Sequence, residues 1–263
     1  MTKRTFAKTS LAVAAAGCLT SKPVAAVTTK EKSPRDFYEL RSYALKGAKQ
    51  PMLEEYLGKA FIPAATRLGF GPVGVFIEPG TDDKVTVHVL VVGKSVAELA
   101  MLGTRVAEDT QYQKDAAAYL AATAADPVYE RIETFLMRAI EGLPKIEKTD
   151  TSKPRLLNLR MYESHNERAA AKKIEMFNKS ELAIFRRVGL NPVFMSETII
   201  GSHMPNLIYM LVFSGEDARK AAWDKFRGDS EWVALKAIPE YADKEIVSHI
   251  TNKILTPAAC SQI

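Results

Sequence analysis

The 263-residue sequence lacks most of the features that reveal a protein's chemistry directly. It contains two cysteines, Cys18 and Cys260, which are too few for a thiolate metal site or a disulfide framework. Its four histidines show no metal-binding spacing such as His-x-x-x-His. There is also no glycine-rich phosphate loop and no Gly-x-Ser-x-Gly turn. We therefore expect no metal site and predict no cofactor, and we do not expect nucleotide chemistry or serine hydrolysis.

Long hydrophobic runs are absent as well. No stretch approaches the roughly 18 apolar residues that a membrane span needs. The composition is 47% hydrophobic and 25% charged, which is typical of a globular protein with a substantial core. The length suits two domains of ordinary size.

Residues 1–26 differ from the rest of the chain. Lys3, Arg4 and Lys8 precede a short apolar run, "LAVAAAGCL", and a segment of small residues, which is the order of an export signal. The segment resembles a twin-arginine signal with Lys3 in place of the first arginine. We expect export to the periplasm or cell envelope. Cys18 is a candidate lipidation site, and the alternative is that it leaves with the cleaved signal.

This segment also carries most of the net charge. The whole chain has 36 basic and 31 acidic residues and a net charge of +5. Residues 1–26 hold four basic residues and no acid, so their removal leaves 32 basic against 31 acidic residues, or +1. A nucleic-acid partner, which needs a large basic surface, is not expected. Membrane contact is expected only through a lipid on Cys18.

The remaining sequence repeats itself at a spacing of about 120 residues. "FYELRSY" (Phe37–Tyr43) corresponds to "LLNLRMY" (Leu156–Tyr162), and "RLGFGPV" (Arg67–Val73) corresponds to "RVGLNPV" (Arg187–Val193). Two further matches, "VTVHVLV" with "NLIYMLV" and "EDTQYQ" with "GDSEWV", follow in the same order. This spacing predicts a tandem repeat. The predicted organisation is an export signal (1–26), a linker (27–35), a first domain (36–140), a linker (141–154) and a second domain (155–263).

Each copy alternates between strand and helix periodicity in the order βαββαβ, that of a ferredoxin-like unit. We expect Gly189 to end the first helix of the second copy, and Pro63 to kink its counterpart or end it early. Ser95, Ser164 and Ser214 are the expected helix N-caps. Each sheet has one face covered by helices, so two copies can cover each other's bare faces. The expected fold class is α+β: tandem ferredoxin-like repeats forming a pseudo-dimer that resembles a dimeric α/β barrel.

The phrases "YELRSYALK", "RLGFGPVGVF" and "YMLVF" followed by "GDSEW" resemble the NIPSNAP family, whose domains belong to the dimeric α/β-barrel group. The resemblance covers Asp36–Ile263 and is to exported bacterial two-domain members. It fits the second copy better, which has Trp223 and Trp232. The resemblance implies the barrel but little chemistry, because the wider group includes cofactor-free monooxygenases, haem enzymes and lyases.

Arginine and tyrosine recur in the first strand of each copy. Alternation in the strands puts Arg41 with Tyr43, and Arg160 with Tyr162, on one face. If the apolar face meets the helices, these four side chains point between the two sheets. A buried guanidinium needs an acid or a ligand. One interpretation pairs Arg41 with Glu39 or Glu133, and Arg160 with an acid such as Glu197. The other is a pocket for a small anionic or carbonyl-bearing molecule.

Histidines supply the candidate catalytic groups. The match of the third strands places His88 and Tyr209 at equivalent positions facing the cavity, where His88 is a candidate general base and Tyr209 a candidate ligand-binding residue. If Ser164 caps its helix, His165 lies at the first position beside the cavity mouth, as a second candidate base. The alternative is that His88 is a satisfied interior histidine and His165 an exposed one. His203 is expected to be a solvated loop residue.

Three functional hypotheses follow. The first is an exported protein that binds a small anionic or carbonyl-bearing molecule between its sheets. The second is a cofactor-free barrel enzyme, similar to a monooxygenase or a lyase, with a histidine base. The third is a structural or assembly module with a filled barrel, which would form a homo-oligomer.

Overall fold

The computed structural model describes residues 34–81 and 83–263, which belong to one compact unit. The predicted export signal (1–26), the lipidation candidate Cys18 and most of the first linker lie outside the described residues. No helix in the described part of the chain is long and apolar enough to cross a bilayer.

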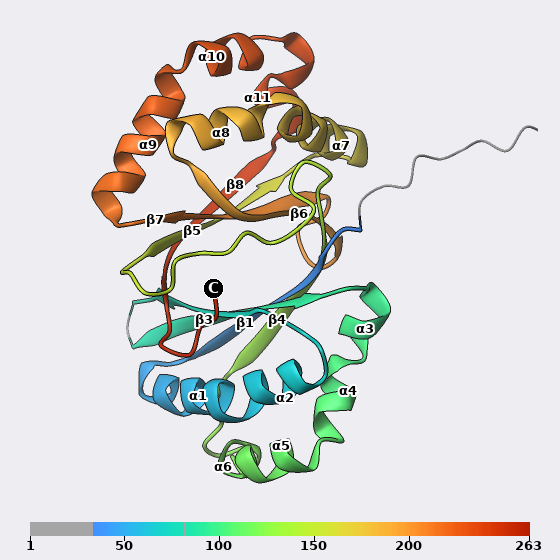
Figure 1. The fold of residues 1–263 in the computed structure, drawn as a ribbon, viewed down its shortest axis with the longest axis vertical. Helices are drawn as coiled ribbons and strands as arrows, with labels where there is room; N and C mark the ends of the chain where they lie inside the picture. Colours follow the sequence, from blue (N-terminus) through green and yellow to red (C-terminus); the bar gives the residue numbers. More distant parts are fainter. Residues whose placement is uncertain (1–33, 82) are drawn as a thin grey trace, which may run out of the picture. The chain divides into compact units, whose positions relative to one another are not determined.

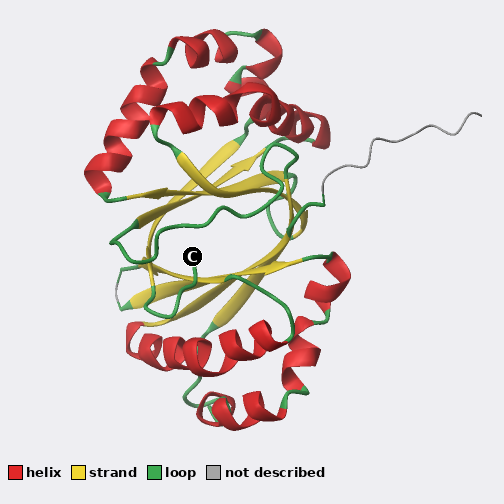
Figure 2. Cartoon of the chain, viewed as in Figure 1, coloured by secondary structure: helices red, strands yellow, loops and turns green. Residues whose placement is uncertain are grey.

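Eight antiparallel strands form a closed barrel in the order β1-β3-β2-β8-β5-β7-β6-β4. Figure 2 shows these strands as the central layer between two groups of helices. The expected strands are all present, although the last strand of each half begins later than expected. The bounds are β1 (Phe37–Lys46), β2 (Val73–Pro79), β3 (Lys84–Gly93), β4 (Arg131–Ala139), β5 (Leu156–Glu163), β6 (Asn191–Ile200), β7 (Asn206–Phe213) and β8 (His249–Pro257).

The barrel consists of two sets of four strands with the same internal order. The first set is β4-β1-β3-β2 and the second is β8-β5-β7-β6. They join where β2 meets β8 and where β4 meets β6. Both junctions are short: β2 pairs with β8 through two residues only, Phe76 and Ile77. Closure removes most free strand edges.

Helices cover the outside of the barrel. In Figure 1 the helices α1 to α6 lie on the side of the first four strands, and α7 to α11 lie on the side of the second four. The bounds are α1 (Gln50–Tyr56), α2 (Ile62–Arg67), α3 (Val96–Ala100), α4 (Leu102–Ala107), α5 (Thr110–Asp115), α6 (Ala117–Leu120), α7 (Glu167–Met176), α8 (Leu182–Val188), α9 (Glu216–Gly228), α10 (Ser230–Lys236) and α11 (Asp243–Ile246).

The long helix of each half contains a π-helical turn at the same place. Leu57–Phe61 joins α1 to α2, and Phe177–Glu181 joins α7 to α8. Pro63 lies in the first turn after the first π-helical turn, where a missing N–H is tolerated. The helix continues through Pro63 to Arg67, so the expectation of an early end is wrong. Gly189 ends α8 in the left-handed conformation (φ 91°), as expected.

Two of the expected N-caps are wrong. Ser95 accepts a hydrogen bond from the Glu98 N–H as predicted. In the second half, Asn166 rather than Ser164 caps α7, by accepting from the Ala169 N–H. Ser164 instead donates to the Ile246 carbonyl oxygen. The third candidate is not a cap either, because Gly215 precedes α9. Serine and asparagine both serve as caps, so the motif alone did not distinguish them.

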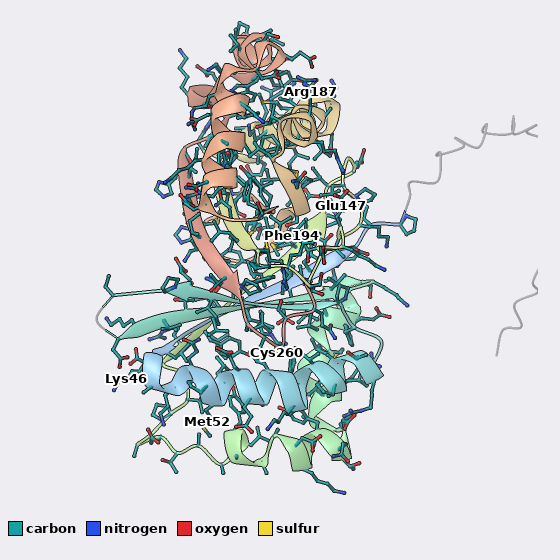
Figure 3. The ribbon with its side chains drawn as sticks, turned by 60° about the vertical axis from the view of Figure 1, so that its left-hand side comes forward. Lys46, Met52, Glu147, Arg187, Phe194 and Cys260 are labelled. Carbon is teal, nitrogen blue, oxygen red and sulfur yellow. The ribbon has the colours of Figure 1, made fainter. Side chains whose placement is uncertain are left out.

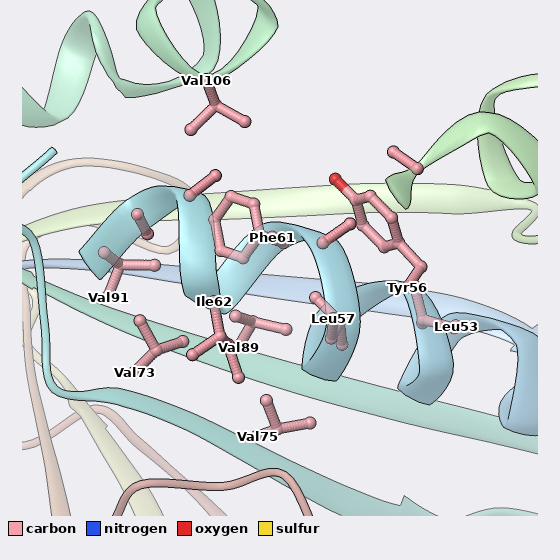
Figure 4. Packing of buried hydrophobic residues seen from close by; sticks show 14 of the residues in the cluster. Leu53, Tyr56, Leu57, Phe61, Ile62, Val73, Val75, Val89, Val91 and Val106 are labelled. Carbon is pink, nitrogen blue, oxygen red and sulfur yellow. The ribbon is translucent and has the colours of Figure 1, made fainter. Parts of the chain in front are cut away.

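The core has three layers. In the first outer layer, Leu53, Phe61 and Ile62 pack on Val89 and other strand residues (Figure 4). A matching layer in the second half is built around Phe177, Phe185, Trp223 and Phe226, so this aromatic cluster is core. The third layer lies inside the barrel and contains Phe194, which is labelled in Figure 3.

The interior is filled at one end only. Ile263 is 2% exposed and packs there with Tyr38, Phe194 and Met137. The chain reaches this position because residues after β8 follow β2, with the Gln262 N–H bonded to the Val73 carbonyl. The predicted linker between the halves contributes a partly buried residue, Ile146, to the same layer. The other end holds the cavity described below.

Candidate functional site

Three polar side chains from adjacent strands form a hydrogen-bonded chain inside the barrel. Ser42 on β1 and His88 on β3 are direct cross-strand partners, and Ser42 Oγ lies 2.8 Å from His88 Nδ1. On β2, Glu78 faces Thr86, two residues from His88 on the same face. Its Oε2 lies 2.9 Å from His88 Nε2. Sheet register therefore positions all three groups.

The electrostatics favour a neutral imidazole. His88 is 2% exposed, and burial lowers its pKa, outweighing the opposing effect of Glu78. Burial acts to raise the pKa of Glu78, but hydrogen bonds from His88 and Lys253 outweigh it and the pKa is lowered. A neutral ring that donates from Nε2–H to the Glu78 carboxylate has Nδ1 free to accept the Ser42 hydroxyl proton. His88 is thus held as a base with one defined tautomer.

A cavity of about 330 Å³ opens beside this chain. Its inner wall is mostly apolar, and charged and polar groups gather toward its mouth. Lys253, whose Nζ lies 2.6 Å from Glu78 Oε2, brings a cation to the wall. The lining residues are Leu40, Ser42, Ala44, Thr86, His88, Arg131, Glu133, Phe135, Leu159, Met161, Ser202, His203, Ile208, Thr251 and Lys253.

The arrangement supports proton transfer. Ser42 Oγ faces the cavity while its proton is directed to His88 Nδ1, so its lone pairs accept a hydrogen bond from a bound molecule. A proton leaving that molecule passes to Ser42 as the hydroxyl proton moves to His88. Glu78 stabilises the imidazolium that forms, and Lys253 places positive charge close to the anion left behind. Within residues 34–81 and 83–263, no cluster of metal-ligating side chains is found.

This chain of groups exists in the first half only. Met161 and Ile208 are cross-strand partners in the second half, as Ser42 and His88 are in the first. Both also line the cavity, where they contribute hydrocarbon. The positions that hold Ser42 and His88 in the first half are therefore apolar in the second half, whose polar lining comes from other residues such as Thr251 and Lys253.

The arginines and tyrosines predicted to line this cavity lie elsewhere. Arg41 and Tyr43 face the helices of the first half, and Arg41 lies 5.1 Å from the centroid of the Phe61 ring. The prediction that they point between the sheets is wrong. Arg41 donates to Glu39 from Nε (2.8 Å) and Nη2 (2.9 Å), which confirms one of the two expected partners. Both faces of a helix-covered barrel wall are buried, so alternation could not tell inside from outside.

Arg160, Tyr162 and Tyr209 also lie on the helix side of their strands. The Tyr209 hydroxyl donates to the Tyr162 hydroxyl at 2.8 Å. Tyr209 is the cross-strand partner of Arg160, whereas the partner of Arg41 is Val89. The expected equivalence of His88 and Tyr209 is therefore off by one residue, and such a slip moves a side chain to the opposite face.

The other histidines have different surroundings. His165 is exposed beside the N-cap of α7 and lies outside the barrel cavity, so its expected place at the cavity mouth is wrong. His203 is an exposed loop residue, as expected, and it lines the mouth of the barrel cavity.

Sequence reasoning missed Ser42, Glu78 and Lys253. Ser42 is the neighbour of Arg41 on β1 and points to the opposite face, so placing Arg41 inside the barrel puts Ser42 outside it. Pairing the β2–β3 hairpin residue by residue places Glu78 beside His88, so hairpin register was the available signal. Lys253 meets them only because β8 closes the barrel against β2, a long-range contact with no local signature.

Comparison with known proteins identifies part of the chain. Residues 157–262 match the NIPSNAP family model. The matched residues lie in the second half of the chain. This match supports the predicted resemblance for that half. No curated protein sequence matches the chain.

Several solved structures share the fold of this chain at very low sequence identity. One is a provisionally assigned monooxygenase from Fusobacterium nucleatum (TM-score 0.59, 7% identity), covering 86% of this chain and 93% of its own. A second provisionally assigned monooxygenase, from Lactobacillus acidophilus, has a TM-score of 0.57 and 8% identity, covering 85% and 94%. A protein described as anthrone oxidase-like has a TM-score of 0.54 and 9% identity, covering 86% and 93%. These likenesses show a mixed α/β fold around an eight-stranded barrel, and the fold alone.

Proposed function

We propose that this protein binds a small, mainly apolar molecule with a carbonyl or anionic group in the barrel cavity and removes a proton from it. The observation that carries the proposal is the Ser42–His88–Glu78 chain, because an interior histidine with no chemical role does not need a hydroxyl relay facing an open cavity. Lys253 supports it by supplying a cation where an enolate or phenolate would form.

Binding and catalysis are separable. The geometry of His88 supports a catalytic role beyond binding, because a hydrogen bond to the Glu78 carboxylate leaves Nδ1 available as an acceptor. The barrel neighbours are named as two provisionally assigned monooxygenases and an anthrone oxidase-like protein. For this chain we propose a reaction that needs no cofactor for its first step. In such a reaction the first step is loss of an acidic proton next to a carbonyl.

Anthrone is a suitable probe because it has a ketone, an acidic CH₂ group and a flat apolar body. Binding is measured by calorimetry, and proton transfer is followed by the visible absorbance of the anthrone anion. We expect saturable binding, and we expect His88→Gln to slow proton transfer by about 10²–10⁴-fold. Ser42→Ala should also slow it, and the exposed His165→Gln is the matched control that should not. Unchanged proton transfer in His88→Gln refutes the base assignment.

The binding claim has its own test. Ala44 lines the cavity and is half-buried, so Ala44→Phe adds volume where the probe would lie. We expect this variant to keep its circular dichroism spectrum and lose anthrone binding. If it binds as well as the unmodified protein, the cavity is not the binding site.

Architecture and location complete the proposal. The repeated strand order and the paired π-helical turns support tandem ferredoxin-like repeats that form an internal pseudo-dimer. The export signal in residues 1–26 supports a periplasmic or cell-envelope location. The test is to measure the mass of the protein purified from the cell envelope of its native host. A mass lower than that of the full chain shows cleavage of the signal, and added mass on Cys18 shows lipidation.

A further inference from the structure

A second hollow lies on the outside of the second half, between the C-terminal part of β5 and the helices that cover it. This outer groove has a volume of about 650 Å³. Both tryptophans of the chain, Trp223 and Trp232, line it. The lining residues are Arg160, Tyr162, Arg219, Lys220, Trp223, Asp224, Phe226, Arg227, Trp232, Lys236, Asp243 and Ile250.

The corresponding arginines of the two halves, Arg41 and Arg160, have different partners. In the first half, Glu39 lies two residues before Arg41 and neutralises it through two hydrogen bonds. In the second half, Asn158 takes the place of Glu39 before Arg160. Asn158 is fully buried and uses its amide elsewhere, donating to Asn252 and accepting from the Trp223 indole N–H. The carboxylate that compensates the first arginine is therefore missing for the second.

Nothing else in the described residues replaces that carboxylate. Within residues 34–81 and 83–263, no carboxylate oxygen forms an ion pair with the Arg160 guanidinium, in contrast to Arg41 and Lys173. Its Nη1 donates to Asn252 Oδ1, and its Nε is buried without a partner. The nearby carboxylate of Glu181 is already paired with Lys173 at 2.8 Å. Arg160 is thus a half-buried cation without a counter-charge, which is unfavourable unless an anion binds.

The surroundings of Arg160 define the kind of anion. Its guanidinium stacks on Trp223, 4.6 Å from the ring centroid, and lies 5.4 Å from the centroid of Tyr162. Arg219 is held by Glu216, and Arg227 by Asp224, so these cations are largely compensated. The site therefore offers one uncompensated guanidinium beside the exposed edges of two largely buried indole rings, since Trp223 and Trp232 line the groove and are 9% and 7% exposed. This combination suits one planar carboxylate on an apolar body better than a multiply charged phosphate.

We propose that the outer groove binds a small organic carboxylate, with Arg160 contacting the carboxylate and Trp223 and Trp232 contacting the apolar body. The bound carboxylate takes the electrostatic role that Glu39 has in the first half. The groove is separate from the barrel cavity, so its occupancy does not depend on His88.

Benzoate is the probe, and uncharged benzamide is its matched control. Because the only two tryptophans line the groove, intrinsic tryptophan fluorescence reports directly on it. We expect benzoate to saturate the signal with a dissociation constant on the order of 1 mM. Benzamide and inorganic phosphate should each bind at least about 10-fold more weakly, a loss of roughly 1.4 kcal/mol. Equal binding of benzamide or of phosphate overturns the carboxylate assignment, as does the absence of saturable benzoate binding.

Substitutions at Asn158 test the mechanism. Asn158→Glu restores the carboxylate of the first half, and we expect it to weaken benzoate binding at least about 10-fold by pairing internally with Arg160. Asn158→Gln introduces a side chain of nearly the size of glutamate but without its charge. Its dissociation constant for benzoate should stay within about 3-fold of that of the unmodified protein. Equal losses in the two variants would show a packing effect and overturn the proposal. Arg160→Gln should abolish binding while His88→Gln leaves it unchanged, which separates this site from the barrel cavity.

Discussion

A buried ion pair in the second half occupies two positions that are apolar in the first half. Lys173 Nζ lies 2.8 Å from Glu181 Oε2, and the side chains are 2% and 1% exposed. Counted from the π-helical turn of each half, the corresponding residues are Leu53 and Phe61, which are also buried. The same helix thus packs with a charge pair in one half and hydrocarbon in the other, so hydrocarbon is a natural replacement at both positions.

The cost of breaking the pair follows from its surroundings. Lys173 otherwise meets the Phe177 ring, 4.8 Å from its centroid, and Met176 Sδ at 3.7 Å. Neither replaces a carboxylate, so removing one partner strands a charge, at a cost of about 3–5 kcal/mol. Replacing both charges with apolar groups of similar volume ranges from neutral to stabilising by about 1–4 kcal/mol. We expect Lys173→Leu and Glu181→Leu each to destabilise strongly, and the double variant to match or exceed the unmodified protein.

Denaturant titrations of the four proteins give the coupling directly. A loss of about 4 kcal/mol corresponds to a Tm roughly 8–16 °C lower for a domain of this size class. The Lys173→Leu variant should also depend on pH. Burial raises the pKa of Glu181, and removing Lys173 raises it further. Protonation then relieves the stranded charge, so this variant should be closest to the unmodified protein near pH 5 and weakest near pH 8. Small, additive losses in the cycle would refute the reasoning.

Three further outcomes are expected. Burial lowers the pKa of His88, so as pH falls below the ordinary histidine range the unfolded chain is protonated before the folded one. The free energy of unfolding should then decline by up to about 1.4 kcal/mol per pH unit. His88→Gln should remove this pH dependence, and the control His165→Gln should keep it. Gly189→Ala should cost about 1 kcal/mol in thermal unfolding because φ is +91°, whereas Gly103→Ala, inside α4 with no atom near the added methyl, should stabilise by about 0.5–1 kcal/mol. Asn166→Ala should cost about 1 kcal/mol through the lost cap of α7, and Asn166→Ser should restore it.

Most of the fold could be predicted from the sequence, because the pattern that indicates each strand and helix occurs in both halves. Strand alternation and helix periodicity located every strand, and Gly189 ended its helix as predicted. A barrel followed from the need to bury the second face of each sheet. The errors lay at helix ends, where Asn166 and Ser164 are both plausible caps and only tertiary contacts choose between them.

The site was harder to predict from the sequence, because its residues depend on which face of each strand points into the barrel. Ser42 and Arg41 are neighbours on β1, and an error of one residue exchanges their environments. Long side chains such as Arg41 carry enough hydrocarbon to lie beneath a helix while their polar ends reach a partner, so they do not mark the interior. His88 was found because a histidine in an apolar strand stands out. Its partners Glu78 and Lys253 required the barrel to be closed first.

The differences between the halves carry more functional information than their similarities. Where both halves keep the same residue type, as at Gly69 and Gly189, the backbone requires it. Where they diverge at matched, buried positions, packing cannot be the sole reason, because the other half shows an alternative that packs. Ser42 and His88 against Met161 and Ile208 mark the barrel cavity in this way, and Glu39 against Asn158 marks the outer groove. Because the two halves share one strand order, each half serves as a reference for the other: the counterpart of a polar group shows how the same position is filled by an apolar or neutralised residue.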